Sequence, residues 1–299
     1  MRKRLRAATR GSALALWQTR HVGSLLGTEL EEVVVSTVGD RNTDVPIHTM
    51  GGKGVFVKEV QAALLDGRAD IAVHSGKDLP AVTPSELKLV AVPTRADARD
   101  ALVGSTWESL PTGARVATGS VRRRAQLAWH RPDLVFSELR GNIQTRLQKL
   151  ESGGFDAIVM AAAALDRLEL SLDVPVERLD PSVMVPQVAQ GSLAIECRSD
   201  DHDTVDQLVV IQDTAARRVF DAERAFLDEL GGDCDLPAGA HAVLTEDGTI
   251  DLVAMLSSLD GRVLVTERRT DDDADALGRG AARFLLDERG GRDLLADSR

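Results

Sequence analysis

Short apolar segments alternate along the first third of the chain with longer segments of helical periodicity. Runs rich in small apolar and β-branched residues predict strands at 5–9, 32–38, 69–74 and 88–93. Helical spacing predicts helices at 13–27 and 56–66, and a loop rich in Gly, Asp and Thr covers 39–54. This alternation is typical of a parallel or mixed sheet, whose ligands bind at the carboxyl ends of the strands.

The pattern recurs as two short strand–turn–helix units in series. The first predicts a strand at 114–118 and a helix at 121–130 with Ser120 as its N-cap. The second predicts a strand at 134–139 and a helix at 143–151. Four arginines belong to these units, two in the first turn of the first helix and two after the second strand: Arg122, Arg123, Arg140 and Arg146.

Cations in the first turn of a helix oppose its macrodipole, so these arginines are poorly placed for stability. The same turn offers free N–H groups to an anion, and a guanidinium binds both oxygens of a carboxylate or phosphate. A run of three arginines can also be a solvated helix face. Because a second strand–turn–arginine unit follows, we favour a site for a polyanion.

Several polar residues follow directly after predicted strands, where a sheet of this type binds its ligand. They are Arg10, Ser12, Ser75, Lys77, Asp78, Ser120, Arg122 and Arg140. Their shared position predicts one cleft between two domains.

The predicted elements group into three domains. Residues 97–100 resemble a hinge, residues 186–191 a second connector, and the strand at 192–198 can return to the first domain. A helical run at 203–230 precedes strands at 241–245, 249–258 and 261–269 and a helix at 274–289. We therefore expect an α/β fold with domain 1 at 1–95 and 189–208, domain 2 at 96–188, and a small α+β domain 3 at 209–299.

Charge is distributed unevenly over the 299 residues. The formal net charge is −11, and residues 199–299 alone carry 24 acids and 11 bases. This distribution disfavours a nucleic-acid binder, which presents a broad basic face. Because the basic N-terminus lacks an apolar segment after it, and no run is long enough to cross a membrane, we expect a cytoplasmic protein.

The candidate reactive side chains each have a structural alternative. Asp78, after an apolar strand and beside Lys77, suits acid–base or electrostatic catalysis, or is a loop aspartate. His74 and Cys197 lie in buried-strand patterns and are expected to be structural. Cys234 lies in a glycine-rich loop, where a thiol is exposed or incidental. No Cys/His cluster has metal-ligand spacing, so we expect no metal.

Ordered motifs along the whole chain resemble one family. They are ATRGSALALWQ (8–18), GGKGVFVKE (51–59), ADIAVHSGKDLP (69–80), ATGSVRRRAQL (117–127), LRGNIQTRLQKL (139–150), AQGSLAIECR (189–198) and the loop around Cys234. The chain is identified by these motifs as similar to the hydroxymethylbilane synthases, also called porphobilinogen deaminases.

The resemblance implies two lobes like those of periplasmic binding proteins, a small third domain, and usually a monomer. It implies a dipyrromethane cofactor attached to Cys234, and condensation of four porphobilinogen units with loss of ammonia, followed by hydrolysis to hydroxymethylbilane. Asp78 matches the catalytic aspartate. Matching cofactor positions are Lys77, Ser75, Thr118, Ser120, Arg122, Arg123 and Arg146. Matching substrate positions are Arg10, Ser12, Arg140 and Gln190, and Lys53 and Phe56 match a lid loop.

Four residues depart from the usual family pattern. Gly76 stands where many relatives have Met, Gly119 where Ser is common, and Ala189 and Asp233 where Gly is usual. Ala189 is expected to stiffen domain motion, and the charge of Asp233 to raise the pKa of the neighbouring thiol. A non-catalytic two-lobed protein that binds polycarboxylates is the main alternative, and a ligand-sensing regulatory domain is the third.

Overall fold

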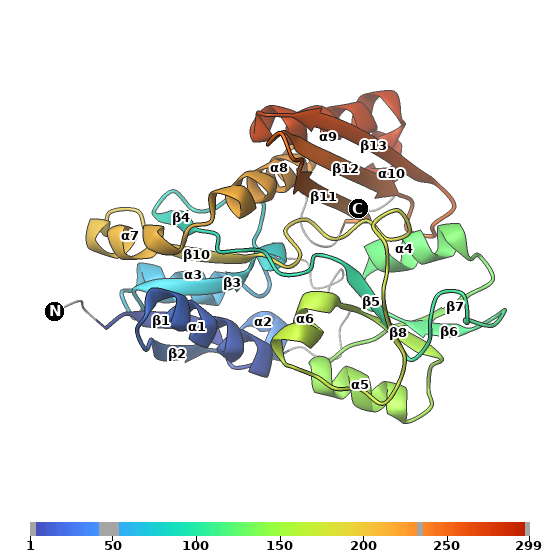
Figure 1. Ribbon diagram of the computed structural model, residues 1–299, viewed down its shortest axis with the longest axis horizontal. Coiled ribbons are helices and arrows are strands. Elements are labelled where there is room, and N and C mark those ends of the chain that lie inside the picture. The colour runs from blue at the N-terminus through green and yellow to red at the C-terminus, as the bar shows by residue number, and fades with distance from the viewer. Residues whose placement is uncertain (1–3, 42–53, 232–235, 297–299) are drawn as a thin grey trace.

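The computed structural model describes residues 4–41, 54–231 and 236–296, and arranges them in three sheets with flanking helices (Figure 1). Two of the sheets have five strands each, and the third has three. The predicted α/β class, with two mixed-sheet units and a small α+β unit, is confirmed by this arrangement.

The first sheet has the strand order β2-β1-β3-β10-β4. β1 pairs in parallel with β2 and β3, whereas β10 runs antiparallel between β3 and β4. β10 is the strand that was expected to return to the first domain. The strands are β1 (Arg6–Arg10), β2 (Glu31–Val35), β3 (Ile71–Ser75), β4 (Leu87–Ala91) and β10 (Leu193–Arg198). The helices are α1 (Ala13–Leu26), α2 (Val38–Arg41), α3 (Lys58–Leu65), α7 (His202–Leu208) and the 3₁₀ turns η2 (Gly76–Asp78) and η3 (Val209–Ile211).

The second sheet repeats this plan with the order β7-β6-β8-β5-β9. β6 pairs in parallel with β7 and β8, and β5 runs antiparallel between β8 and β9. The strands are β5 (Asp100–Val103), β6 (Arg115–Ala117), β7 (Val135–Ser137), β8 (Ala157–Ala161) and β9 (Val176–Arg178). The helices are α4 (Val121–His130), α5 (Ile143–Glu151) and α6 (Ala162–Arg167).

The third sheet is an antiparallel meander packed against two long helices. It consists of β11 (Ala238–Leu244), β12 (Ile250–Ser257) and β13 (Leu264–Asp271), with α8 (Thr214–Leu230), α9 (Ala274–Glu288) and the short α10 (Gly291–Ala296). Phe220 and Phe226 of α8 are fully buried in a cluster with residues of all three strands and of α9. The predicted helical run at 203–230 is interrupted, because Asp213 accepts a hydrogen bond from the Ala216 N–H and starts α8.

Side-chain caps explain why α4 and α5 begin where the sequence predicts. The Ser120 hydroxyl accepts a hydrogen bond from the Arg123 N–H, and Asn142 accepts one from Thr145 N–H at 2.9 Å. These caps fix the first turns, and therefore the direction in which the arginines of both helices leave the backbone. The strand predicted at 134–139 is shorter, because only Val135–Ser137 pairs with β6.

The chain crosses between the first two sheets twice, after β4 and before β10 (Figure 1). The crossings are in contact: a Cβ built on Gly191, whose φ is +86°, would lie 2.5 Å from the carbonyl oxygen of Ala96. Only glycine fits both this φ and this approach without strain. The two crossings therefore form one packed hinge rather than two separate linkers.

A buried carboxylate joins the hinge to the third sheet. Glu223 of α8 accepts hydrogen bonds from both terminal nitrogens of Arg95, at 2.7 and 3.1 Å, and from the N–H groups of Ala189 and Ala242. Ala189 has φ +58°, a left-handed conformation that costs an alanine free energy and is held here by this contact.

The methyl group of Ala189 fills the space beside Gly76. A Cβ built on Gly76 would lie 3.1 Å from Cβ of Ala189 and 2.8 Å from Cε2 of Phe220. The absence of a side chain at Gly76 is therefore matched by the methyl group at Ala189. This contact connects the hinge to the turn that carries Lys77 and Asp78.

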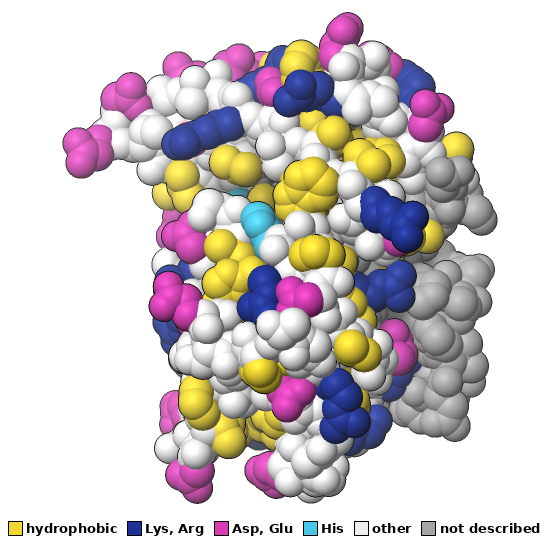
Figure 2. Space-filling model, turned by 90° about the vertical axis from the view of Figure 1, so that its right-hand side faces the viewer, with side chains coloured by type: hydrophobic (Ala, Val, Ile, Leu, Met, Phe, Trp, Pro, Cys, Tyr) yellow, Lys and Arg dark blue, Asp and Glu magenta, His cyan; other side chains and the backbone are white. Residues whose placement is uncertain are grey.

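No helix in the described part of the chain combines the length and the apolarity that a membrane crossing requires. On the face shown in Figure 2, Lys and Arg side chains are interspersed with Asp, Glu and apolar side chains. Positive charge forms no continuous surface on that face.

Candidate active site

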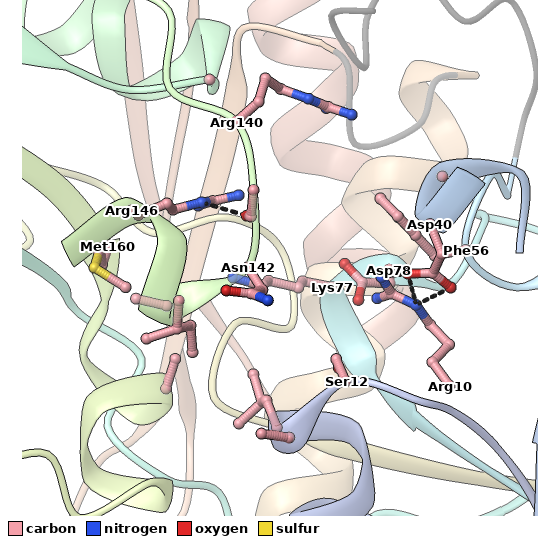
Figure 3. Close-up of a pocket in the computed structure, with 18 of the residues that line it drawn as sticks. Arg10, Ser12, Asp40, Phe56, Lys77, Asp78, Arg140, Asn142, Arg146 and Met160 are labelled. Carbon is pink, nitrogen blue, oxygen red and sulfur yellow. Dashed lines mark hydrogen bonds and ion pairs between the residues drawn. The ribbon is translucent and has the colours of Figure 1, made fainter. Parts of the chain in front are cut away.

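The carboxyl ends of the parallel strands of both sheets face a cavity of about 660 Å³. Its charged lining residues come from both sides: Arg10, Asp40, Lys77, Asp78, Arg123, Arg140 and Arg146. In Figure 3, Arg140 and Arg146 lie on one side and Arg10 and Asp40 on the other, with Lys77 and Asp78 between them. The cleft expected from the strand-end rule is thus present, and it brings together the predicted residues among them, with Asp40 as an addition that was not predicted.

Lys77 and Asp78 occupy the 3₁₀ turn that follows β3. Within the described residues the Asp78 carboxylate accepts no hydrogen bond, and it is half-buried at the cavity wall. Lys77 Nζ donates to Oε1 of Gln190 at 3.1 Å. Burial, together with the nearby Arg123, lowers the pKa of Lys77 to about 8, against an opposing effect of Asp78. The turn therefore presents an uncommitted carboxylate beside an amine that loses its proton near pH 8.

Arg146 and Arg140 supply positive charge from the second sheet's side of the cavity. Arg146 Nε donates to the Gly141 carbonyl oxygen at 2.9 Å. Burial, with the charges of Arg123 and Arg140, lowers the pKa of Arg146 to about 10. A desolvated cation beside two other cations is costly, and Glu138 opposes this effect only in part, so the group is suited to a carboxylate or phosphate.

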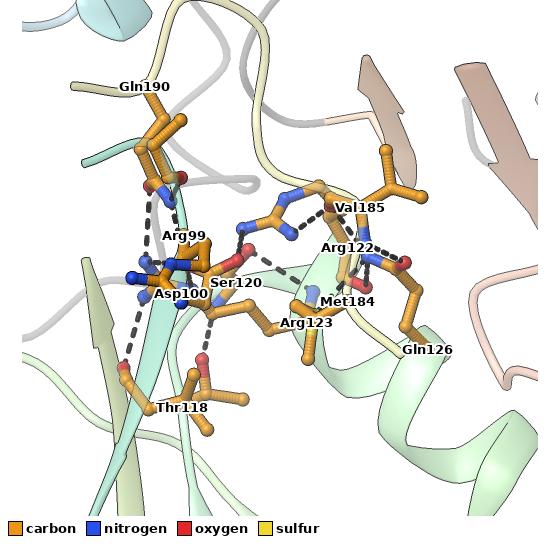
Figure 4. Close-up of polar contacts among 12 residues, drawn as sticks. Arg99, Asp100, Thr118, Ser120, Arg122, Arg123, Gln126, Met184, Val185 and Gln190 are labelled. Carbon is orange, nitrogen blue, oxygen red and sulfur yellow. Dashed lines mark hydrogen bonds and ion pairs between the residues drawn. The ribbon is translucent and has the colours of Figure 1, made fainter. Parts of the chain in front are cut away.

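Arg122 and Arg123 share one buried partner, Asp100 (Figure 4). Arg122 Nη2 donates to Asp100 Oδ2 at 2.8 Å, and Arg123 Nε donates to Oδ1 at 2.9 Å. Burial alone would raise the pKa of Asp100, but the two guanidinium groups and Gln190 hold it at about 2. Two cations and one anion leave a net positive charge at the cleft wall.

The two arginines differ in access to the cleft. Arg123 lines the cavity, whereas Arg122 is 2% exposed and its other nitrogen, Nη1, donates to the Val185 carbonyl oxygen at 2.6 Å. Arg122 instead borders a small space with Lys77 and Leu236, two residues beyond Cys234. Cys234 itself and Lys53 lie outside the described residues.

Arg10 meets the cleft from the end of β1. Its guanidinium pairs with Asp40 and stacks on the ring of Phe56, 4.1 Å from the ring centroid. Ser12 caps α1 by accepting a hydrogen bond from the Ala15 N–H and also lines the cavity. The predicted lid residue Phe56 is thus placed against a predicted substrate residue.

The remaining candidates lie behind the cavity wall. Ser75 accepts a hydrogen bond from Gln18 Nε2 at 2.9 Å and borders a side cavity of about 90 Å³. Thr118 is buried and accepts from the Ser120 N–H at 3.2 Å. Gln190 is fully buried and bridges Lys77 and Asp100. These groups can orient cleft residues.

Two predicted structural residues are confirmed as such. His74 is buried, with Nε2 3.1 Å from Oε2 of the buried Glu196. Cys197 is fully buried on β10, and burial raises the pKa of its thiol to about 11, which leaves it protonated and unreactive.

Sequence reasoning missed three charged residues near the cleft: Asp40, Asp100 and Arg167. Arg167 is buried on α6, where its Nη2 donates to the Gly191 carbonyl oxygen at 2.7 Å. Recognising the alanine-rich run after β8 as a helix would have placed Arg167 near the end of a strand. Nothing in the spacing of Asp100 or Asp40 indicates their arginine partners.

The donor set fits an anionic ligand with several carboxylates and flat rings. Five cations line the cavity against two carboxylates, and Leu139, Ile143, Met160 and Leu168 supply apolar wall between them. Within the described ranges no three His, Cys, Asp or Glu side chains gather as a metal site would require. A dipyrromethane group, which carries carboxylates on pyrrole rings, matches this lining.

Comparisons with known proteins match this chain to one family along nearly its whole length. The family description "Porphobilinogen deaminase, dipyromethane cofactor binding domain" matches residues 5–206, and "Porphobilinogen deaminase, C-terminal domain" matches residues 218–287. A porphobilinogen deaminase of Exiguobacterium sibiricum is 43% identical and covers 98% of both chains. One of Roseiflexus castenholzii is 45% identical over 99% of this chain and 100% of its own.

Two solved structures show distant similarity to this chain. A substrate-binding domain of a putative amino acid ABC transporter from Streptococcus pneumoniae has a TM-score of 0.43 at 12% identity, over 69% of this chain and 90% of its own. An ancestral cationic amino acid solute-binding protein has a TM-score of 0.43 at 16% identity, over 74% and 93%. These scores carry no argument about function. The two family descriptions and the full-length relatives do, and the chain belongs to the porphobilinogen deaminase family.

Proposed function

We propose that the cleft between the first two sheets is where this protein carries out the reaction of its family. The reaction is that of hydroxymethylbilane synthase: four porphobilinogen units are condensed head to tail with loss of ammonia, and hydrolysis releases the linear tetrapyrrole. The single observation that carries the proposed location is the uncommitted Asp78 carboxylate within a ring of cations.

We assign Asp78 to catalysis. Each condensation breaks the carbon–nitrogen bond of an aminomethyl group, joins that carbon to a pyrrole α-carbon, and releases the α-carbon's proton. The electron-poor carbon and the pyrrole N–H groups both favour a fixed negative charge nearby, and a half-buried site screens that charge weakly. The Asp78 carboxylate supplies it.

Asp78 also separates this proposal from that of a non-catalytic polycarboxylate-binding protein. A carboxylate that accepts no hydrogen bond, in a cleft that only binds carboxylates, would weaken binding by repulsion between like charges. Its presence at the centre of the cleft favours catalysis.

The arginines and Lys77 are assigned to the substrate carboxylates and to those of the cofactor. The dipyrromethane cofactor supplies the nucleophilic pyrrole end to which substrate units are added. We place Arg123, Arg146, Lys77 and Ser120 around it, with Ser75, Thr118 and Arg122 in support. Arg10, Ser12 and Arg140 hold incoming substrate, and Gln190 orients Lys77. The desolvated Arg146 and the surplus of cations support this assignment.

The proposal also includes attachment of the cofactor to Cys234 and three domains, at 1–95 with 189–208, at 96–188 and at 209–299. It further includes a monomeric state, no nucleic-acid partner and a cytoplasmic location. Cys234 is favoured over Cys197, because Cys197 is buried with a raised thiol pKa. The mass of the intact protein tests the attachment. We expect it to exceed the mass of the chain by one dipyrromethane, and Ehrlich's reagent to stain the acidified protein.

The matched pair Cys234→Ser and Cys197→Ser decides which thiol is used. A hydroxyl is a much weaker nucleophile than a thiolate, so Cys234→Ser should fold without the added mass, whereas Cys197→Ser should keep it. An unmodified wild-type mass, or a full adduct on Cys234→Ser, would contradict the attachment.

A further inference from the structure

Arg10, to which the proposed function assigns a substrate carboxylate, is already paired with a carboxylate of the protein. Its Nε lies 3.1 Å from both Oδ1 and Oδ2 of Asp40, and its Nη2 also pairs with Oδ1. The two side chains are 24% and 29% exposed, and both line the cleft (Figure 3). In the described part of the chain Arg10 donates to no other group. The edge of the guanidinium best suited to a planar anion is therefore occupied.

Asp40 is held in this position by its own segment. It lies on α2, where its Oδ2 accepts hydrogen bonds from the Thr37 hydroxyl at 2.7 Å and the Thr37 N–H at 3.2 Å. The Gly39 N–H donates to the Val55 carbonyl oxygen at 3.2 Å and ties α2 to the segment that precedes α3. Burial alone would raise the pKa of Asp40, but Arg10 and Thr37 hold it below its ordinary value, so the carboxylate is charged.

An aromatic ring completes the surroundings of Arg10. The Phe56 ring lies under the guanidinium, and a Cβ built on Gly39 would lie 2.1 Å from Cε1 of that ring. Because Gly39 has no side chain, both the Phe56 ring and Asp40 can contact Arg10. Asp40 thus places a carboxylate in the plane of the guanidinium, and Phe56 places an aromatic face against it. A pyrrole acetic or propionic acid would offer the same two groups.

We propose that Asp40 is a built-in competitor, which occupies Arg10 until a carboxylate of porphobilinogen displaces it, and so sets the affinity of this side of the cleft. The inference rests on the proposed substrate role of Arg10. One guanidinium edge holds one carboxylate bidentately, so a substrate that uses Nε and Nη2 must move Asp40 away.

The competitor gives selectivity to a strongly cationic cleft. Without it, Arg10 would bind any small carboxylate or phosphate that diffused in. With it, an anion must offer more than one contact in order to displace Asp40, as a pyrrole with two carboxylates does. This is discrimination by a competing interaction rather than by an added attractive one.

Asp40→Asn in the cofactor-loaded enzyme tests the proposal. Asn keeps the size and the cap to Thr37 but removes the charge. Because a partly exposed ion pair contributes modestly, we expect KM for porphobilinogen to fall about fivefold with kcat little changed. Inhibition by inorganic phosphate should strengthen by a similar factor. Asp133→Asn is the matched control, because the Asp133–Arg131 pair has side chains 30% and 25% exposed and does not line the cleft.

Two further variants make the outcomes decisive. In an Arg10→Gln background, Asp40→Asn should no longer change KM. A higher KM in Asp40→Asn that Asp40→Glu restores would show that Asp40 holds Arg10 ready for substrate, and would overturn the proposal, as would an unchanged KM. If Arg10→Gln alone left KM unchanged, the substrate role of Arg10 would fail first, and the inference with it.

Discussion

Asp100→Asn should destabilise the hinge more than any single surface change. The wild-type carboxylate is fully buried and neutralises both Arg122 and Arg123, so the variant leaves two buried guanidinium groups without a counter-charge. Removing one partner from a buried ion pair costs about 3–5 kcal/mol. The measurement is the midpoint of urea unfolding at pH 7, followed by tryptophan fluorescence. Trp107, which packs against the core of the second sheet, is a suitable reporter.

The pH dependence of stability gives a second estimate of how much Asp100 contributes to the free energy of unfolding. The pKa of Asp100 is about 2 in the folded protein against 3.8 for the ordinary group, a difference that corresponds to roughly 2 kcal/mol of stability. Because the folded pKa is depressed, this contribution is present above pH 4 and is lost as pH falls towards 2, with about 1 kcal/mol lost between pH 6 and pH 3. Asp100→Asn should lack this part of the acid dependence.

The control for the unfolding midpoint is Asp133→Asn, which breaks a partly exposed pair with Arg131 and should shift the midpoint far less. An Asp100→Asn variant as stable as wild type at pH 7, with the same loss of stability between pH 6 and pH 3, would refute the role of Asp100 as the counter-charge.

Three other predictions concern the cations. Lysine substitutions at Arg10, Arg123, Arg140 and Arg146 should each stop growth at a defined number of pyrrole units, because an ammonium cannot reproduce a bidentate contact worth about 2–5 kcal/mol when desolvated. Mass spectrometry of trapped adducts would show this, and wild-type turnover in all four would contradict the cleft assignment. Arg122→Lys should instead lower stability, because its guanidinium holds Asp100 and Val185. Activity that requires charged Lys77 should decline above about pH 8, where that amine loses its proton, and Lys77→Arg should move the decline to higher pH; an unchanged pH profile would contradict this.

The sequence predicted best what depends on local chemistry. The helices Val121–His130 and Ile143–Glu151 span the expected residues, and they begin there because Ser120 and Asn142 cap them through side chains that act over three residues. The strand-end rule brought Arg10, Asp78 and Arg140 to one cavity, because it depends only on the direction of parallel strands.

What the sequence left open depends on contacts between distant segments. Asp100 meets Gln190 across the hinge, and Asp40 meets Arg10 across thirty positions of chain. Arg122 and Arg123 are neighbours in sequence and both are buried, but they lie about 100° apart around the helix, so that of the two Arg123 alone also lines the cleft. The compensation of Gly76 by Ala189 likewise appears only when both segments are in place.

Single-turnover consumption of porphobilinogen by cofactor-loaded Asp78 variants tests the central claim most directly. Asp78→Asn keeps the shape of the side chain and removes its charge, whereas Asp78→Glu keeps the charge and moves it by one methylene group. Losing one preorganised charged group costs on the order of 10²–10³ in kcat. We predict that Asp78→Asn retains the cofactor with almost no turnover and that Asp78→Glu keeps measurable activity. Turnover of Asp78→Asn at the wild-type rate would contradict the account.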